Sequence, residues 1–438
     1  MVVIGFARLF SDMGISNAII YRQDNTRDEL SSLYWINIGL GIIIFGIICI
    51  ISPLIVSFYH EPRLNNLILM ISFIFLITPF GQQFQVLLQR ELNFNMLAIV
   101  TIIASVINTF TAIVMALYGM GVYSLIWGQL AGSFLHTLLL ILWGCRNSRP
   151  SLHFSRRDLK GYLGFGLYQM GERSINYFNA NLDYLIIGSL LGATSLGYYT
   201  LAYNLILKPL LMINPIITKV AFPVFSKLQN NATMLKTWYL KVLQLLSTVN
   251  FPILAGMAVV APIAIPLALG EKWLPSVVLI QILSVVGILK SIGNPMGSLL
   301  LSKGRADLGF KWNAAVLIPQ ILGLYIGGTL GGAVGVAAAY ALLMCIFSIA
   351  GYVILIRTLL GPCLREYISS MWSTFFITTI MGFIVLIIGV IFKSLPGHIL
   401  LIAEILAGIT VYLLLMIYKQ KSLVMEIKEM VYRTKSYE

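Results

Sequence analysis

The sequence predicts an all-α, polytopic membrane protein. Its apolar composition, the lengths of its apolar runs and the placement of its basic residues all support this class. Hydrophobic residues make up 59% of the 438-residue chain and charged residues 10%, whereas soluble domains average about 45–50% apolar and about 25% charged residues. A chain with so many apolar residues cannot cover itself with polar surface, and this excludes an ordinary soluble enzyme. Disorder is excluded as well, because it requires low hydrophobicity and high charge.

The apolar residues fall into runs of the length that a helix needs to cross a bilayer, about 20 residues. The runs lack sustained alternation of apolar and polar residues, which favours helices over a transmembrane barrel. The twelve predicted transmembrane helices cover 34–57, 64–88, 95–118, 121–143, 164–190, 195–218, 242–268, 276–301, 310–329, 332–357, 368–392 and 397–418. Residues 1–10 resemble the end of a further helix, so we expect a leading half-helix and more residues upstream in the native protein.

Lys and Arg side chains are divided unevenly between the two sides of the predicted membrane. When the loops are assigned alternately to the two sides, one side receives 22 of the 29 basic residues and the other three, while four lie inside helices. Because Lys and Arg are retained on the cytoplasmic side during insertion, the basic side, with the C-terminus, is predicted to be cytoplasmic. The net charge of +13 then reflects orientation, and no nucleic-acid partner is expected.

The loops offer little room for catalysis. The longest predicted outer loop, 269–275, has seven residues, and the basic inner loops 144–163 and 219–241 carry no Ser/His/Asp or Cys/His arrangement. The four cysteines lack the spacing of a metal site or of a disulfide framework. A phosphate-binding G-x-x-x-x-G-K-[ST] loop is also absent. We therefore expect a protein that is not an enzyme and that uses no cofactor or metal.

The two halves of the chain share a sequence pattern. Gly81 and Gly293, 212 residues apart, are each followed by a leucine pair and a basic turn, and the tight turns at Gly121 and Gly335 are 214 residues apart. An offset of six helices preserves orientation, so we predict two lobes related by an axis along the membrane normal. The predicted domains are an incomplete N-terminal lobe at 1–143, a basic cytoplasmic linker at 144–163, a C-terminal lobe at 164–358, two additional helices at 359–418 and a basic cytoplasmic tail at 419–438.

A stripe of polar side chains runs along the helix predicted at 164–190. At 100° per residue, six polar residues share an arc of about 120°. The stripe climbs roughly 21 Å at 1.5 Å per residue, which is most of the hydrocarbon thickness of about 30 Å. Its members are Gln169, Glu172, Arg173, Asn176, Asn179 and Asp183. Other polar residues at membrane depth are Arg8, Asp12, Asn204, Lys208, Lys290 and Glu404.

These side chains predict a hydrated cavity between the lobes. On insertion scales each charge costs about 2.5–3.5 kcal/mol at mid-membrane. Eight of the side chains above are ionisable, and a native stability of about 5–15 kcal/mol could not offset their combined cost if all faced lipid. Since Arg and Lys suit phosphate oxygens, we expect a substrate-binding set made of Arg8, Arg173, Lys208, Lys290, Gln169, Asn176, Asn179 and Asn204. The candidates for coupling to a proton or to Na⁺ are Asp183, Glu172 and Asp12.

Two structural alternatives stay open from the residues alone. Asn side chains in membrane helices often hydrogen-bond to neighbouring helices, so the stripe can serve packing. Arg8 and Asp12, four residues apart, can neutralise each other. Glu404 stands alone near the outer third of its helix, where a structural role is favoured.

Several segments resemble one known family. They include "VIGFARLFSDMGISNAIIYR", "PFGQQFQVLLQRELNFN", "RPSLHFS", "GYYTLAYN", "FPVFSKLQ" and "GEKW". Together they resemble the Wzx-type polysaccharide flippases of the multidrug/oligosaccharidyl-lipid/polysaccharide exporter superfamily, in the branch that includes the colanic acid exporter. The resemblance runs from residue 1 to the tail.

The resemblance implies a fold of two six-helix lobes with two extra helices. It also implies export of an undecaprenyl-diphosphate-linked oligosaccharide across the bacterial inner membrane, by alternating access of the lobes, for lipopolysaccharide or other surface polysaccharides. Membrane lipids, a polysaccharide polymerase and the export machinery would be its partners. The alternative within the superfamily is a cation-coupled exporter of drugs or small solutes. The predicted outer loops are too short for a membrane-embedded enzyme. A purely structural scaffold would leave the polar stripe unexplained.

Overall fold

The computed structural model describes residues 4–5, 7, 26–91, 93–147, 150–155 and 162–419. For 145, 147, 162–173, 219 and 306, it describes the backbone alone. Throughout these ranges the regular secondary structure is helical, with no strand. This confirms the predicted all-α class. The chain divides into two compact units, Met1–Asn181 and Leu182–Glu438, and each is described by itself.

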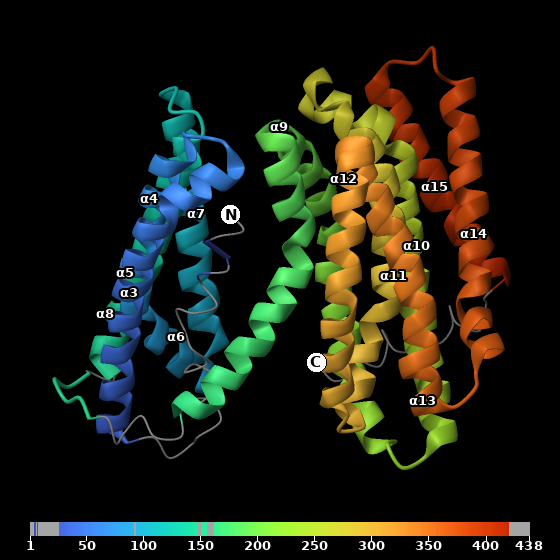
Figure 1. The fold of residues 1–438 in the computed structure, drawn as a ribbon. Helices are drawn as coiled ribbons and strands as arrows, with labels where there is room; N and C mark the ends of the chain where they lie inside the picture. The colour runs from blue at the N-terminus through green and yellow to red at the C-terminus, as the bar shows by residue number, and fades with distance from the viewer. Residues whose placement is uncertain are drawn as a thin grey trace. The chain divides into compact units, whose positions relative to one another are not determined.

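The first unit is built from antiparallel helices (Figure 1). Its described helices are α3 (Arg27–Tyr59), α4 (Leu64–Ser72), α5 (Ile74–Ile77), α6 (Pro79–Arg90), α7 (Phe94–Leu117), α8 (Tyr123–Asn147) and the first part of α9 (Tyr162–Lys227). α3 begins at a capping box, in which the side chain of Thr26 accepts from the backbone N–H of Glu29, and the Glu29 carboxylate accepts in return.

The segment at 150–155 is tied to the beginning of α3. The indole N–H of Trp35 donates to the carbonyl of Ser151 at 2.9 Å, and the backbone N–H of Ser151 donates to Oγ of Ser31 at 2.9 Å. The backbone N–H of Ser155 donates to Oγ of Ser32 at 3.0 Å. Part of the predicted basic linker is therefore held against the first unit by the serines of one helix end.

A proline and two glycines explain two features of the first unit. The helix predicted at 64–88 is a bent pair, with 51° between Leu64–Ile77 and Pro79–Arg90, because Pro79 lacks the N–H that would continue the helix. Gly128 and Gly132 of α8 both lie against Asn108 of α7, where a Cβ would come within 2.8 Å or less of neighbouring atoms. Small residues at this spacing allow membrane helices to approach closely.

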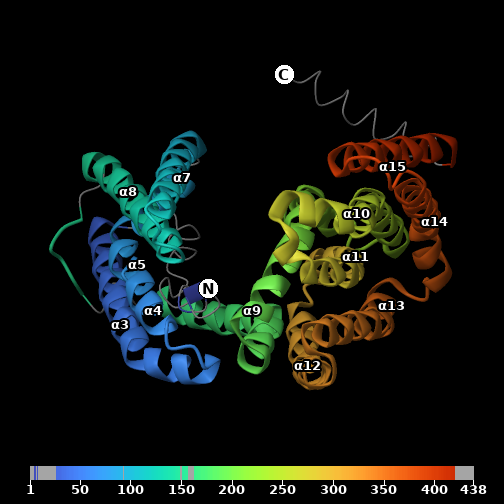
Figure 2. The ribbon, with the colours of Figure 1, turned by 90° about the horizontal axis from the view of Figure 1, so that it is seen from above.

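The second unit continues through α9 into five further long helices, which can be followed in Figures 1 and 2. Its elements are α10 (Ala232–Leu269), a 3₁₀ turn η1 (Glu271–Trp273), α11 (Pro275–Ser302), α12 (Ala306–Gly351), a π-helix η2 (Tyr352–Ile356), α13 (Arg357–Leu360), α14 (Leu364–Ile391) and α15 (Gly397–Lys419). α14 and α15 pack against α10 and against each other.

Two very long helices each contain a break. α9 has 66 residues with a left-handed residue at Gly192 (φ 78°), and α12 has 46 residues with non-helical angles at Gly331 and Gly332. The break at Gly192 falls between the crossings predicted at 164–190 and 195–218, and the break at Gly331 and Gly332 falls where the crossing predicted at 332–357 begins. Among the described residues, nine helices, or up to ten if the bent pair counts as one, are long and apolar enough to cross a membrane. The chain is therefore a multi-pass membrane protein, and the number of crossings stays a prediction.

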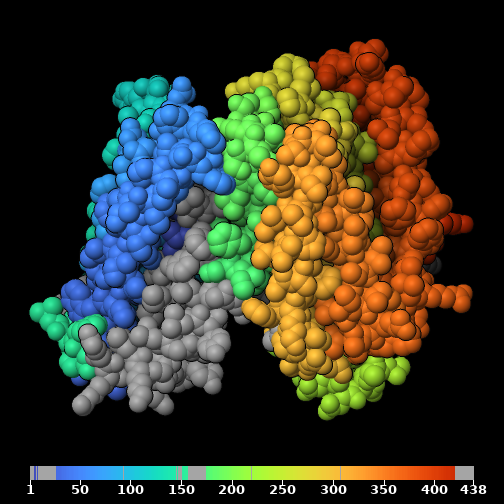
Figure 3. Space-filling model, in the orientation of Figure 1, coloured from blue at the N-terminus to red at the C-terminus, as the bar shows by residue number. Residues whose placement is uncertain are grey.

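Apolar side chains cover the outside of the second unit, as a bilayer-embedded protein requires. α12 lies at the front of the space-filling view (Figure 3). On this helix Leu322, Ile326 and Leu342 are each more than half exposed. The core beneath contains fully buried aromatic residues, Tyr199, Tyr203 and Tyr340 among them. Their hydroxyls must find partners inside the unit.

Candidate functional site

The candidate site begins with a buried carboxylate in the second unit. Asp183 is 1% exposed, and its Oδ2 accepts a hydrogen bond of 2.8 Å from the Tyr199 hydroxyl. In a straight helix the two residues would be about 24 Å apart. They meet because the break at Gly192 turns the second part of α9 back along the first. The backbone N–H of Tyr184 donates to Oδ1 at 3.0 Å, so each carboxylate oxygen has a donor.

Tyrosine rings surround this carboxylate. Tyr199 and Tyr203, one helical turn apart, are stacked with centroids 5.8 Å apart and planes 19° apart. Tyr184 packs edge-on against both rings, at 5.9 Å and 5.6 Å. Tyr340 of α12 places its hydroxyl 3.5 Å from that of Tyr203. The cluster thus joins both parts of α9 to α12 through polar groups inside an apolar core.

Lys290 of α11 supplies the positive charge. Its Nζ donates to the Tyr203 hydroxyl at 2.5 Å and lies 5.1 Å from the centroid of the same ring. A nitrogen this close to the hydroxyl and this far from the centroid lies at the hydroxyl end of the ring, so the contact is a hydrogen bond and not a cation over a ring face. Nζ also lies 5.2 Å from the centroid of Tyr340.

Asp183 and Lys290 therefore lie at the two charged ends of one tyrosine cluster. The ammonium acts electrostatically on the carboxylate. The Tyr199 hydroxyl bonds to the carboxylate, and the Tyr203 hydroxyl bonds to the ammonium. A buried charge is costly without hydrogen bonds or a partner charge, and each carboxylate oxygen of Asp183 has a hydrogen-bond donor. Lys290 is half-buried whereas Asp183 is fully enclosed, so the lysine is the more accessible end. We refer to Asp183, Tyr199, Tyr203, Lys290 and Tyr340 as the Asp–Tyr–Lys network.

The structure brings two of the predicted site residues together, Asp183 and Lys290. Asn204 and Lys208 lie exposed on the second part of α9, and their side chains are not part of the network. Asn176 is exposed and Asn179 half-buried, both on the part of α9 that belongs to the first unit, and both have interaction partners.

The other predicted residues lie beyond what the structure describes. Arg8 and Asp12 are outside the described residues, as are the side chains of Gln169, Glu172 and Arg173. Their assignment to a binding or coupling role therefore stays a prediction.

Sequence reasoning missed a second buried polar group. Nδ2 of Asn250 in α10 donates to Oδ1 of Asn214 in α9 at 2.9 Å and to Oγ of Ser291 in α11 at 2.7 Å. Asn250 and Ser291 are fully buried, so one amide links three helices. Both asparagines stand beside prolines in apolar runs, before Pro215 and near Pro252, and this local pattern could have drawn attention to them.

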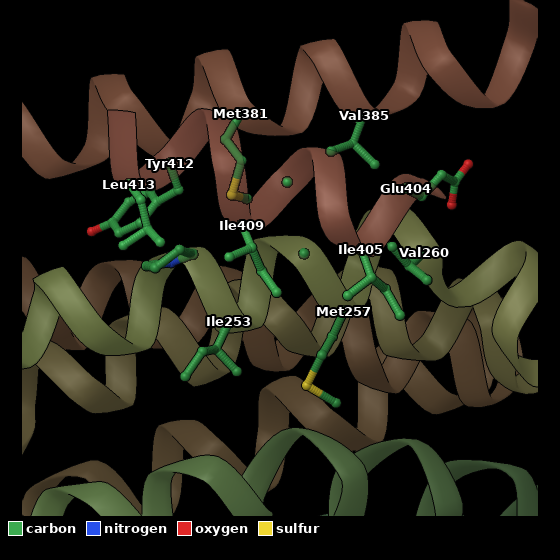
Figure 4. Close-up of a pocket in the computed structure, with 13 residues that line it drawn as sticks. Ile253, Met257, Val260, Met381, Val385, Glu404, Ile405, Ile409, Tyr412 and Leu413 are labelled. Carbon is green, nitrogen blue, oxygen red and sulfur yellow. The ribbon is translucent and has the colours of Figure 1, made fainter. Parts of the chain in front are cut away.

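An apolar pocket of about 370 Å³ lies between α10, α14 and α15 (Figure 4). Its walls are almost entirely hydrocarbon, with Ile253 and Met257 on α10 and Met381 on α14. Glu404 stands at one end, with its carboxyl directed away from Ile253 and Met257 (Figure 4). The carboxyl is 3% exposed, its Oε1 lies against Gly389, and its Oε2 has no hydrogen-bond partner in the described chain. This places Glu404 in a helix contact apart from the Asp–Tyr–Lys network.

The fold is that of known membrane transporters. The solved structure described as "Lipid II flippase MurJ, inward closed conformation" aligns with a TM-score of 0.77 at 16% identity, covering 96% of this chain and 91% of that one. An inward-facing multidrug resistance transporter of the MATE family aligns with a TM-score of 0.64 at 18% identity, covering 82% of this chain and 88% of that one. At such identities the likeness concerns the fold alone.

The sequence comparisons identify the family. Residues 1–278 match the family described as "Polysaccharide biosynthesis protein", and the chain belongs to it. It is 38% identical over 394 residues to the lipopolysaccharide biosynthesis protein WzxC of Escherichia coli K12, which covers 90% of this chain and 80% of WzxC. It is 35% identical over 424 residues to the teichuronic acid biosynthesis protein TuaB of Bacillus subtilis 168, covering 94% and 86%. These findings confirm the predicted resemblance to the polysaccharide flippases.

Proposed function

We propose that this protein moves a lipid-linked oligosaccharide, joined to undecaprenyl diphosphate, from the inner to the outer leaflet of the bacterial inner membrane for surface polysaccharide synthesis. The similarity to WzxC over 90% of the chain is the observation that carries the proposal. Relatives from other bacteria are named for the biosynthesis of teichuronic acid and amylovoran. The fold matches a lipid II flippase over more of the chain than it matches the MATE transporter, which favours lipid-linked sugars over small solutes.

The physical task is to carry a polar head group across hydrocarbon. Each unpaired polar group costs several kcal/mol there, so a sugar diphosphate needs a lined path while its polyprenyl tail stays in lipid. Lys290 is suited to bind phosphate oxygens, because its ammonium has three donors and is half-buried in the second unit. Lys208, Arg173 and Arg8 are further candidate cations. Asn176, Asn179, Asn204 and Gln169 are candidates for sugar contacts.

The proposed mechanism is alternating access of two lobes, 1–143 and 164–358, with helices 359–418 added to the second lobe. The linker at 144–163 and the tail at 419–438 are proposed to be cytoplasmic, since Lys and Arg concentrate there. We propose transport without catalysis, with a polymerase and export machinery as downstream partners. Asp183 is our first candidate for ion coupling, since it is a buried carboxylate in the same tyrosine cluster as Lys290.

A complementation experiment tests this function. A strain lacking its own oligosaccharide flippase is given the native gene, and surface polysaccharide is measured together with the amount of protein in the membrane. We expect the wild type to restore polysaccharide, Lys290→Gln to restore little of it at equal abundance, and Lys272→Gln, an exposed lysine outside the network, to behave as wild type. Full export by Lys290→Gln would contradict the assigned role of Lys290, and failure of the wild type in strains with several different repeat units would contradict the function.

A further inference from the structure

One short segment outside the helices carries two exposed apolar side chains. Residues 150–155, which we call the linker strap, follow α8 and have no regular helical structure. Ser151 and Ser155 are half-buried, whereas Leu152 and Phe154 between them are 92% and 53% exposed. Exposed apolar surface that is gathered in one place is typical of a site that contacts lipid or another protein.

The linker strap is tied at both ends to the beginning of α3. The Ser151 carbonyl accepts from the indole N–H of Trp35 at 2.9 Å. The backbone N–H and the hydroxyl of Ser151 both donate to Oγ of Ser31, at 2.9 Å and 3.0 Å. The backbone N–H of Ser155 donates to Oγ of Ser32 at 3.0 Å. The residues between the two tied serines are therefore presented at a fixed depth along α3.

That depth is the boundary between head groups and hydrocarbon. α3 has 33 residues and is about 50 Å long at a rise of 1.5 Å per residue. The hydrocarbon core is about 30 Å thick, so about 10 Å of a centred helix lies outside it at each end. Ser31 and Ser32 lie about 6–8 Å from the beginning of α3. Trp35 lies one turn deeper, and tryptophan is enriched at membrane interfaces.

The linker strap projects sideways from the first unit. In Figure 1 it is drawn in teal-green beside the lower end of α8, and in Figure 2 it lies at the outer edge of the unit, beside α3 and α8. The space-filling view shows the same protrusion (Figure 3). Helices that cross a membrane run roughly along its normal, so a sideways projection at the level of the helix ends leads into lipid.

We propose that the linker strap is an interfacial membrane anchor, in which Leu152 and Phe154 insert among lipid acyl chains. Its partner is the lipid surface on the basic side of the membrane. The composition of the surrounding sequence supports this partner, because 144–163 carries five basic residues and one acidic residue. Basic segments are attracted to the anionic lipids of the cytoplasmic leaflet. This inference goes beyond the proposed function and does not depend on the substrate that is moved.

Ser31 and Ser32 are positioning residues in this scheme. Their hydroxyls accept the backbone N–H groups of Ser151 and Ser155, and they do not contact lipid in the proposed role. Loss of both hydroxyls would leave Leu152 in place and release the strap from its fixed depth. The double variant should therefore change how deeply the strap lies in the membrane, whereas a serine that serves only helix packing would not affect that depth.

The experiment measures the depth of position 152 in the full-length protein. Leu152→Cys is labelled with a nitrobenzoxadiazole fluorophore, and the protein is placed in nanodiscs of phosphatidylethanolamine and phosphatidylglycerol. The native cysteines are first replaced by serine at Cys49, Cys145, Cys345 and Cys363. We expect blue-shifted emission, strong quenching by lipids brominated along the acyl chain and weak quenching by aqueous iodide. The depth should be about 5–10 Å into the boundary between head groups and acyl chains.

Two labelled positions bracket the result. Lys227→Cys, at an exposed residue of a predicted inner loop, should be quenched by iodide and not by brominated lipid. Ile326→Cys, at an exposed apolar residue of α12, should be quenched by brominated lipid alone. A label at 152 that behaves like the label at 227 would overturn the proposal. Unchanged quenching at 152 after Ser31→Ala combined with Ser32→Ala would overturn the positioning role.

The wild-type protein provides a second measurement that needs no substitution. A phospholipid with a photoreactive group in its acyl chain is activated in the same nanodiscs, and the modified residues are identified by mass spectrometry. We expect adducts at Leu152 or Phe154 as well as at Ile42 and Ile43, which are exposed on α3. Adducts on α3 without any on the linker strap would overturn the anchor. Failure of the complementation experiment would contradict the proposed function and leave this inference standing.

Discussion

The Tyr199 hydroxyl lies 2.8 Å from Oδ2 of Asp183, and this contact joins the two parts of α9 on either side of Gly192. Both groups are fully buried. A hydrogen bond between a hydroxyl and a carboxylate is stronger than one between neutral groups, so it both satisfies the acid and holds the turn closed. The same contact serves the fold and the candidate site.

Replacing Tyr199 with Phe should destabilise the second unit. The substitution keeps the ring and removes the donor, so Oδ2 of Asp183 is left buried without it, at a cost of about 1–3 kcal/mol. The thermal unfolding of purified protein in detergent measures this. Tyr325→Phe, whose side chain is half exposed on α12, is the matched control and should unfold like wild type. Equal unfolding temperatures for both variants would show that the bond contributes nothing to stability.

Replacing Gly335 with Ala should lower the amount of folded protein. A Cβ at Gly335 would lie 2.0 Å from the carbonyl oxygen of Gly327, across the two halves of α12, and backbone cannot move aside cheaply. Gly331→Ala provides the control in the same helix, because a Cβ there meets nothing within 4 Å. Membrane abundance and monodispersity in detergent report the result. If both variants were equally abundant, this close approach would not limit folding.

Replacing Tyr412 with Phe should loosen the attachment of α15. Pro252 lacks the N–H that would bond the carbonyl of Thr248, and the Tyr412 hydroxyl donates to that carbonyl at 2.6 Å instead. Without the hydroxyl, the carbonyl is left without a donor, at a cost of about 1–3 kcal/mol. Limited proteolysis should cut the variant near 392–397 faster than it cuts Tyr418→Phe, which alters an exposed tyrosine. Identical cleavage rates would argue against this docking role.

Cys363 should react slowly with a charged maleimide. It lies 3% exposed in the connection between α13 and α14, where burial raises the pKa of its thiol, with a smaller contribution in the same direction from Glu366. Only the thiolate reacts, so the labelling rate should climb at higher pH than for an exposed cysteine. Because the folded-state pKa is raised, ionisation of Cys363 should also reduce stability as the pH rises through it.

The comparison for Cys363 is an exposed cysteine introduced at the end of α9. Lys227→Cys, in a background that carries Cys363→Ser, supplies a solvent-exposed thiol. It should label quickly near neutral pH. If Cys363 in the native protein labelled at the same rate and with the same pH dependence, the burial and raised pKa assigned to it would be wrong.

The helical architecture was predictable from the sequence because membrane insertion constrains composition so strongly. Apolar runs of about 20 residues must form helices in lipid, and the breaks at Gly192 and Gly331 fall between predicted crossings. The sequence also singled out Asp183 and Lys290, because charges at membrane depth are costly and therefore informative.

The partners of those charges were beyond sequence reasoning. Tyrosines in membrane proteins commonly stand at the interfaces, and nothing in a local pattern shows that Tyr203 is core and Tyr325 is exposed. The contact between Asp183 and Tyr199, 16 positions apart, depends on how the chain folds back at Gly192. The amide of Asn250 raises the same difficulty, since its two partners lie on other helices.

Transport by purified protein tests the central claim most directly. The protein is reconstituted into liposomes with an undecaprenyl-diphosphate-linked oligosaccharide, and a membrane-impermeant glycosidase reports the sugar that reaches the opposite leaflet. We predict transfer by wild type and by Lys272→Gln, and a loss of at least tenfold in the initial rate for Lys290→Gln at equal incorporation. Equal rates for the three proteins would contradict the account of Lys290 as a binding group on the path of the head group.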